Sequence, residues 1–154
     1  MAARFGLLPA LLLAFCLLFP SAAVASSFEY CKKGADYAVN VSGIDISPFP
    51  IARGELTTFT ISAYTGDVIS EGKLVIDVKY LWFHVYQETH DLCSETSCPV
   101  SAGAFELSHK QTLPMVTPPG WYTLTMTMME EDGKPLTCIT FDFSIGFMSS
   151  VADS

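Results

Sequence analysis

The cysteine residues are the first feature of this sequence that could do chemistry, because they can form covalent cross-links. The chain has 5 cysteines, and Cys16 lies in an apolar N-terminal stretch that we expect to be removed, which leaves Cys31, Cys93, Cys98 and Cys138. An even number of cysteines in a secreted chain favours two disulfide bonds, and four cysteines permit three connectivities. A local Cys93–Cys98 bond is the simplest and leaves Cys31 to pair with Cys138. A zinc site is less favoured, because no two cysteines form a C-x-x-C pair.

The other residue types that carry chemistry show no catalytic arrangement. The histidines His84, His90 and His109 are scattered, and the sequence has no G-x-S-x-G, H-E-x-x-H or phosphate-binding glycine motif. We interpret His84 as a strand residue and His90 with Asp91 as part of a solvated loop rather than a metal site. The acidic run at 130–132 lacks the alternating ligands of a calcium loop. The sequence therefore predicts a non-enzymatic protein without metal or cofactor, with a hydrolase as a weak alternative.

The first 25 residues have the pattern of a secretory signal peptide. Arg4 precedes an apolar run, and Ala23-Val24-Ala25 is an A-x-A site, so we expect cleavage after Ala25. A membrane anchor is less favoured, because the run is shorter than the ~20 residues that span a bilayer and contains Pro9. We therefore expect a signal peptide at 1–25 and one domain at 26–154. The expected location is the secretory pathway, ending outside the cell (the apoplast in a plant) or in a vacuole or lysosome.

The charge balance and the single asparagine constrain partners and modification. The chain has 8 basic and 16 acidic residues, a net charge of −8, and loss of Arg4 with the signal peptide leaves 7 basic residues and −9. Such an acidic chain is not expected to bind nucleic acid or to attach to anionic membranes by charge alone. Asn40 begins an N-V-S sequon and is the expected glycosylation site, so Val39 and Val41 should face inward.

Alternating apolar and polar residues predict the elements that must position these groups. The predicted strand regions are Tyr37–Ser47, Gly54–Tyr64, Leu74–Tyr80, Ala104–Leu113, Trp121–Glu130 and Leu136–Phe147. The longest patterned stretch, Gly72–Pro99, alternates up to Tyr80, is apolar on both parities from Leu81 to Tyr86, and ends in a cysteine pair. No segment has a clear 3.6-residue period. The pattern predicts an all-β, immunoglobulin-like sandwich of two antiparallel sheets with about seven strands.

The predicted inner faces carry many aromatic residues and methionines, which suit either a filled core or a cavity. Two features favour a cavity. The Leu81–Tyr86 segment is apolar on both sides, which a one-sided strand does not require, so we interpret it as the place where a sheet reaches a ligand opening. Met126 and Met128 have flexible side chains that adapt to a variable apolar guest. A cavity of this kind between two sheets would bind a lipid tail or a sterol.

In the order of its cysteines and prolines the chain resembles the ML (lipid-recognition) domain family. The matching features are Cys31 near the mature start, the Cys93/Cys98 pair followed by Pro99, Leu113-Pro114 before the penultimate strand, and Cys138 in the last strand. The resemblance covers nearly all of the chain after the signal peptide and is closest to plant and fungal phosphatidylglycerol/phosphatidylinositol transfer proteins. It implies an immunoglobulin-like sandwich with a lipid between the sheets. It also implies that Cys31 pairs with Cys138 and Cys93 with Cys98.

The resemblance also implies positions for the mouth of the lipid site. Counting from the cysteine pair and the Leu-Pro, as in the sterol-binding member of the family, gives Val85, Met115 and Pro119. That member has aromatic residues at the first and third positions, and this chain does not. The ligand is therefore expected to be either a sterol or a phospholipid acyl chain. The residues expected to line the site are Phe59, Ile61, Tyr80, Trp82, Val85, Phe105, Met115, Pro119, Tyr122, Leu124, Met126, Met128, Phe141 and Phe143.

The sequence thus predicts a secreted, monomeric protein that binds or transfers a lipid and contacts membranes transiently. The alternative is a sandwich with a filled core that acts through its surface, as an adhesion or receptor-accessory domain.

Overall fold

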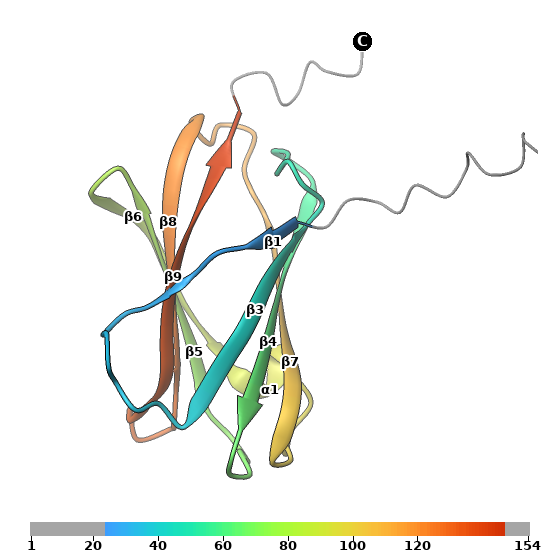
Figure 1. Cartoon of the computed structure of the whole chain (residues 1–154). Coiled ribbons are helices and arrows are strands. Elements are labelled where there is room, and N and C mark those ends of the chain that lie inside the picture. The colour runs from blue at the N-terminus through green and yellow to red at the C-terminus, as the bar shows by residue number, and fades with distance from the viewer. Residues whose placement is uncertain (1–23, 147–154) are drawn as a thin grey trace, which may run out of the picture.

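The computed structural model describes residues 24–146, which form two antiparallel β-sheets packed face to face (Figure 1). The four-stranded sheet has the order β1-β3-β4-β7, with β1 Val24–Ser26, β3 Val39–Ser47, β4 Leu56–Thr65 and β7 Gly103–Thr112. The five-stranded sheet has the order β2-β9-β8-β5-β6, with β2 Glu29–Tyr30, β5 Lys73–Tyr80, β6 Phe83–Asp91, β8 Gly120–Met129 and β9 Pro135–Ile145. The predicted two-sheet sandwich is confirmed, although the described residues form more strands than expected.

The hydrophobic core lies between the sheets because each long strand alternates. In β8, Tyr122, Leu124, Met126 and Met128 are all buried, and the intervening threonines point to the other face of the sheet. Buried residues of β4 and β9 meet them from both layers; for example, the rings of Phe59 and Phe141 lie 6.1 Å apart. The period of two in the sequence therefore indicates which face of each strand is buried.

The N-terminal segment closes one edge of the sandwich. β1 pairs with β3 and β2 pairs with β9, so the chain crosses from one sheet to the other between them, as the blue ribbon in Figure 1 shows. The Cys31–Cys138 disulfide fixes the end of this crossing to β9. At the other edge β6 and β7 belong to different sheets and share no ladder. That edge is consequently joined by side chains rather than by backbone hydrogen bonds.

The predicted strand Leu74–Tyr80 and the doubly apolar segment after it form a hairpin. β5 ends at Tyr80, a two-residue turn follows, and β6 returns from Phe83 with Tyr80 paired to Phe83. The turn is formed by Leu81, whose φ is 59°, and Trp82. Left-handed backbone normally selects glycine or asparagine in such a turn. Because the turn contains neither, the sequence shows no turn signal.

A β-bulge explains the rest of the doubly apolar segment. Val78 pairs with Tyr86 and Lys79 pairs with His84, so Val85 is the extra residue on β6. A bulge leaves one residue unpaired and shifts the facing of those after it. The apolar residues on both parities therefore belong to a turn and a bulge rather than to one continuous strand.

A short helical turn, α1 Leu92–Glu95, follows β6 and was not predicted. Asp91 caps it, since its carboxylate accepts a hydrogen bond from the Cys93 amide at 3.0 Å. Four residues are too few to show a 3.6-residue period. The Cys93–Cys98 disulfide ties this turn to the loop that follows, so both pairings implied by the family resemblance are present.

Several smaller expectations can be compared with the described residues. Asn40 is exposed while Val39 and Val41 are buried, and the register shift in β3 lies at the expected glycine, between Val41 and Gly43. Most of the expected signal peptide, residues 1–23, lies outside the described residues, and Ala25 at the expected cleavage site lies in β1. Within residues 24–146, no helix has the length and hydropathy required to cross a bilayer.

Candidate functional site

A cavity of about 350 Å³ opens between the two sheets at the end of the molecule that carries the β5–β6 turn and the β7–β8 loop. Both sheets contribute walls, and the loop at 113–118 forms part of the rim. The lining residues are mostly apolar or aromatic: Phe59, Ile76, Val78, Tyr80, Val85, Tyr86, His109, Gln111, Thr112, Leu113, Pro114, Val116, Thr117, Pro118, Tyr122, Leu124, Phe143 and Ile145. A concave, apolar site with few polar groups suits an apolar ligand.

Aromatic rings from both sheets form a continuous part of the wall. The rings of Tyr122 and Phe143 are stacked with centroids 5.4 Å apart, and Tyr80 lies 4.8 Å from Tyr122. Phe59 approaches Phe143 from the opposite sheet at 6.1 Å. Ring pairs at these separations attract one another and give the wall a defined shape.

Hydrogen bonds anchor the loop at the cavity mouth. Tyr122 donates its hydroxyl hydrogen to the Pro118 carbonyl oxygen at 2.6 Å, and Tyr80 donates to the Pro119 carbonyl oxygen at 3.0 Å. Burial is the main cause that raises the pKa of Tyr122, and the neighbouring Tyr80 adds to it. The raised pKa keeps this hydroxyl protonated as a donor.

A third bond links the mouth loop to the four-stranded side of the sandwich. The Arg53 Nε donates to the Thr117 carbonyl oxygen at 2.6 Å, from the connection between β3 and β4. The mouth loop is therefore held by side chains from both layers, and it can move only if these bonds break.

The structure brings part of the predicted set of lipid-binding residues to this cavity. Phe59, Tyr80, Val85, Tyr122, Leu124 and Phe143 all line it. They come from β4, β5, β6, β8 and β9; alternation points all of them inward except Val85, which is the bulge residue of β6. This placement shows that the residues converge on one apolar space between the sheets.

A second part of the predicted set lies too far along the strands. Ile61, Met126 and Met128 are buried in the core but do not line the cavity, which occupies only the end of the sandwich near Tyr122. Phe105 is half-buried near the other end of β7. Alternation indicates which face of the sheet a residue occupies, but it does not indicate how far the residue lies from the cavity end of the sandwich. The expectation that methionines form an adaptable wall is therefore corrected.

Three predicted residues lie around the opening or at its rim instead of in the wall. Trp82 is 75% exposed at the hairpin turn, and Met115 is 64% exposed. Pro119 contributes a carbonyl acceptor for Tyr80 and is not among the lining residues, whereas Pro118 is. The offsets taken from another protein miss the lining residues by one position at Met115 and Pro119, because loops change conformation more readily than strands do.

The cavity also contains residues that sequence reasoning did not select. Ile76 and Val78 share the parity of Tyr80 on β5, so their alternation could have identified them. Ile145 follows Phe143 in the same way. His109 could not be recognised, because a single histidine in a strand carries no pattern that distinguishes a cavity wall from a core position.

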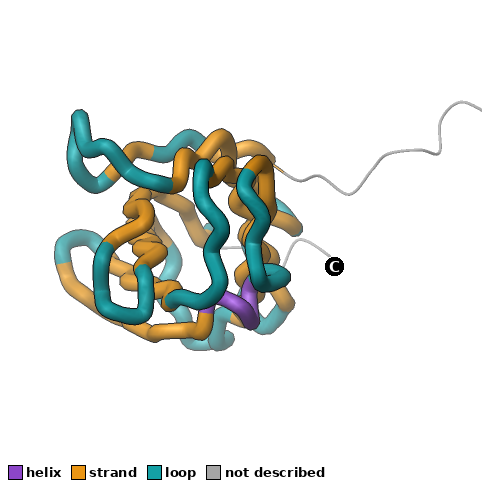
Figure 2. Tube along the Cα trace, turned by 90° about the horizontal axis from the view of Figure 1, so that it is seen from below, coloured by secondary structure: helices purple, strands orange, loops and turns teal. Residues whose placement is uncertain are grey.

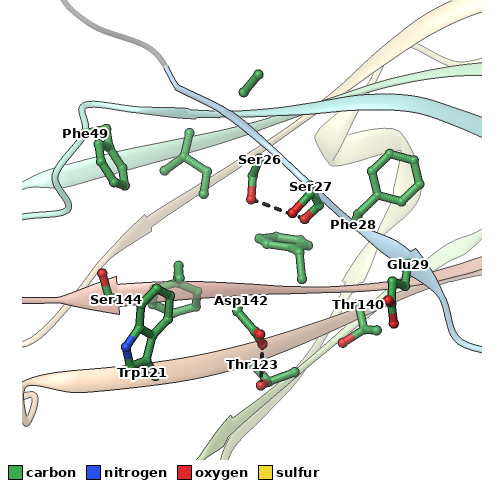
Figure 3. A pocket seen from close by; sticks show the side chains of 14 residues that line it. Ser26, Ser27, Phe28, Glu29, Phe49, Trp121, Thr123, Thr140, Asp142 and Ser144 are labelled. Atoms are coloured by element: carbon green, nitrogen blue, oxygen red, sulfur yellow. Dashed lines mark hydrogen bonds between the residues drawn. The ribbon is translucent and has the colours of Figure 1, made fainter.

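A second, shallower hollow of about 790 Å³ lies at the opposite edge, beside the N-terminal crossing (Figure 3). Figure 3 shows Phe49 and Trp121 at one end of it, and Thr123 donates to the Asp142 carboxylate at 2.7 Å. Phe141 lines this hollow and not the first cavity. About half of the lining residues are polar, so this hollow suits an apolar ligand less well although it is larger.

Comparison with family models matches the ML domain to residues 25–145. A phosphatidylglycerol/phosphatidylinositol transfer protein of Aspergillus oryzae is 31% identical over 117 residues, which cover 72% of this chain and 67% of the relative. A protein of the same name from Mycosarcoma maydis is 31% identical, and the match covers 76% of this chain and 64% of that relative. The chain therefore spans about two thirds of the length of these fungal relatives. An MD-2-related lipid-recognition protein of Arabidopsis thaliana is 32% identical over 139 residues, 85% of this chain and 84% of the relative.

Solved structures share the fold at lower identity. A Niemann-Pick type C2 protein from the Japanese carpenter ant has a TM-score of 0.63 and 17% identity, covering 77% of this chain and 98% of that chain. Chicken MD-1, complexed with lipid IVa, has a TM-score of 0.54 and 15% identity, covering 83% of this chain and 99% of that chain.

Proposed function

Because the chain belongs to the ML domain family, we propose that it holds the apolar part of one lipid in the cavity between its sheets and transfers it between membranes. The observation that carries this proposal is the apolar cavity itself, which opens at one end of the sandwich and is walled by both sheets. A tail placed there is removed from water, and each buried methylene contributes about 0.8 kcal/mol. About a dozen methylenes supply enough free energy for tight binding after ordering costs are subtracted.

The size of the cavity favours one acyl chain of a phospholipid as the group that is held. A volume of about 350 Å³ is at the lower end of the ~300–1,000 Å³ range of ligand pockets. The relatives named as phosphatidylglycerol/phosphatidylinositol transfer proteins support a phospholipid over a sterol. In this proposal the head group stays at the mouth, and a larger apolar group enters only when the sheets or the mouth loop move apart.

Exposed apolar side chains surround the opening and would make the membrane contact. Leu81, Trp82 and Phe83 are exposed at the β5–β6 turn, and Met115 and Val116 are exposed in the mouth loop. In Figure 1 this is the upper end of the molecule, where the β6 hairpin and the β7–β8 connection lie. Aromatic and aliphatic side chains of this kind partition into the interfacial region of a bilayer without requiring a positive surface.

We also propose that the protein enters the secretory pathway and acts as a monomer, in keeping with the N-terminal sequence pattern and the two disulfides. N-terminal sequencing and the native mass of the protein secreted by its host test both points. An N-terminus at Ser26 and a monomeric mass are the expected results.

The lipid proposal is tested by lipid uptake with a matched pair of variants. Val85 lines the cavity and is 51% exposed, so Val85→Asp places a charge in the cavity wall without burying it completely. The control is Val68→Asp, which changes the same residue type at 61% exposure in the loop between β4 and β5, at the other end of the sandwich. We expect Val85→Asp to weaken uptake of a fluorescent phospholipid at least about tenfold, and Val68→Asp to leave it unchanged.

Native mass spectrometry of the purified protein, followed by lipid extraction, identifies the ligand. A phospholipid in the extract supports the proposal, and a sterol overturns the choice of ligand. Recovery of bare polypeptide, together with no uptake of either fluorescent lipid, contradicts lipid binding altogether.

A further inference from the structure

Two histidines and two glutamates meet at the edge where the sheets are joined only by side chains. Glu88 and His90 come from β6, His109 from β7, and Glu95 from α1. One ligand atom from each of Glu88, His90 and His109 lies within 4.8 Å of the others. His90 was expected in a solvated loop, but it is a half-buried strand residue. His109 is only 2% exposed.

We propose that Glu88, His90 and His109 bind a divalent transition-metal ion, with zinc as the natural candidate, and that this ion ties β6 of one sheet to β7 of the other.

The orientation of the rings supports a metal site more strongly than the composition alone. The Nε2 atoms of both histidines face Glu88. His90 Nε2 is hydrogen-bonded to Glu88 Oε1, and His109 Nε2 lies 3.7 Å from the same oxygen. The Nδ1 atoms of both face Glu95, at 3.5 Å from His90 and 3.4 Å from His109. A histidine that binds a metal through one nitrogen normally donates the other N–H to a carboxylate, which fixes its tautomer. Glu95 is placed to accept from both rings.

The donor set matches zinc chemistry. Two imidazole nitrogens and one carboxylate are a common set of protein ligands for Zn²⁺, and a water molecule or a ligand oxygen completes the tetrahedron. Imidazole ligands favour zinc and other late first-row transition metals over magnesium or calcium, which prefer oxygen ligands. Glu88 and Glu95 also bring two carboxylates to the site, and a divalent cation balances their charge.

The Glu88 carboxylate is oriented by its neighbours. Tyr86 donates its hydroxyl hydrogen to the second carboxylate oxygen of Glu88. This leaves Oε1 directed toward the two histidines.

The site adjoins the cavity, because Tyr86 and His109 line it as well. β6 and β7 are the edge strands of different sheets, and an ion held by both opposes separation of the sheets at this edge. Figure 2, which views the molecule from below, shows α1 (purple) at the lower end beside the connecting loops, away from the cavity mouth, and α1 carries Glu95. If the protein carries lipid as proposed above, occupancy by the ion slows lipid release. The metal site itself does not depend on that function.

The first test is a Co²⁺ titration of the full-length purified protein after treatment with a chelator and removal of lipid. We expect one equivalent of Co²⁺ to bind with the visible absorption of a four-coordinate ion, and Zn²⁺ to displace it. His90→Gln should abolish the absorption. Glu95→Gln should keep the three ligands and weaken affinity about 10–100-fold.

The matched control is His84→Gln. His84 lies on the same strand and its Nδ1 is 2.9 Å from an Asp77 carboxylate oxygen, outside the cluster, so this variant should bind Co²⁺ like the wild type. Thermal unfolding of each metal-free variant verifies that it folds. Absence of the Co²⁺ band in wild-type protein, or equal weakening in His84→Gln and His90→Gln, overturns the proposal.

The second test measures release of a fluorescent phospholipid with and without Zn²⁺. Slower release with Zn²⁺ in the wild type but not in His90→Gln supports a metal ion that links the two sheets. Release that is unaffected by bound Zn²⁺ contradicts such a link. Because the Co²⁺ titration contains no lipid, failure of lipid binding and failure of metal binding give different results.

Discussion

Two tyrosine hydroxyls hold the loop at the cavity mouth to the five-stranded sheet. Tyr122 donates to Pro118 and Tyr80 donates to Pro119, both at backbone carbonyls. Gly120, which follows, has a φ of +131°, and a Cβ at this position would lie 3.1 Å from the Tyr80 ring. The residues around the mouth are thus packed closely enough that the loop conformation depends on single side chains.

Removal of one of these hydroxyls should make the mouth open more readily. In Tyr122→Phe the loss of a hydrogen bond costs about 1 kcal/mol, so we expect lipid exchange to become up to about fivefold faster, measured by stopped-flow transfer of a fluorescent lipid. Tyr30→Phe is the control, because its hydroxyl accepts from the Val41 amide at 2.9 Å at the opposite edge. Faster exchange in both variants would point to general loosening and contradict a role for the mouth loop.

Buried hydroxyls without partners mark a second residue-scale feature. Among the described residues, the Thr57 and Thr137 hydroxyls are buried and make no hydrogen bond to another group. An unsatisfied buried hydroxyl costs free energy, and valine has nearly the same shape. We therefore expect Thr57→Val to raise the free energy of unfolding by about 1 kcal/mol, measured by guanidinium denaturation. A decrease would show that the Thr57 hydroxyl has a partner, such as a bound water.

At the scale of elements, the disulfides have unequal tasks. The Cys31–Cys138 bond joins residues 107 apart and fixes the N-terminal crossing to β9, while the Cys93–Cys98 bond joins residues 5 apart and fixes α1. In the chain-entropy account the stabilisation grows with the length of the closed loop. The long-range bond should thus dominate global stability and the local bond should mainly position α1.

The double variants that replace each cysteine pair by alanine should therefore differ. We expect Cys31→Ala with Cys138→Ala to lower the free energy of unfolding by about 4–5 kcal/mol, and Cys93→Ala with Cys98→Ala to lower it by about 2 kcal/mol. Chemical denaturation under matched conditions measures both losses. Equal losses would contradict the division of tasks.

At the scale of the whole molecule, several exposed apolar side chains lie at the mouth end of an acidic protein. Trp82 at the turn is the most exposed aromatic residue among those described. In the proposed function this arrangement lets the acidic molecule meet a bilayer with the cavity mouth facing it, since insertion of apolar groups does not require electrostatic attraction.

If the proposed membrane contact is made here, its loss should slow lipid transfer without changing lipid binding. We expect Trp82→Ser to reduce the rate of lipid transfer between neutral vesicles about fivefold, equivalent to about 1 kcal/mol of lost insertion, with equilibrium lipid uptake unchanged. Tyr64→Ser is the control, because Tyr64 is exposed on β4 and pairs with Asn40 at the other end. Equal rates for the two variants would place the membrane contact elsewhere.

Much of the fold could be predicted because it depends on local periodicity. The alternation in β3, β4, β8 and β9 indicates which residues are buried, and the cysteine spacing with the family resemblance indicates the disulfides. The β5–β6 hairpin could not be predicted, because Leu81 adopts a left-handed conformation without glycine or asparagine to signal it. α1 is too short to show a period.

The sequence by itself determined the inward faces of the strands, since the side chains of a strand alternate whatever their partners are. Only the tertiary structure decided how deep each residue lies and which edges meet. It placed Met126 in the core and Tyr122 at the cavity, although both share one parity. It also brought His90 and His109, which are 19 positions apart, to the same edge with ring centroids 5.2 Å apart. Depth and meeting of edges depend on how the two sheets pack against each other, and no local pattern in the chain encodes that packing.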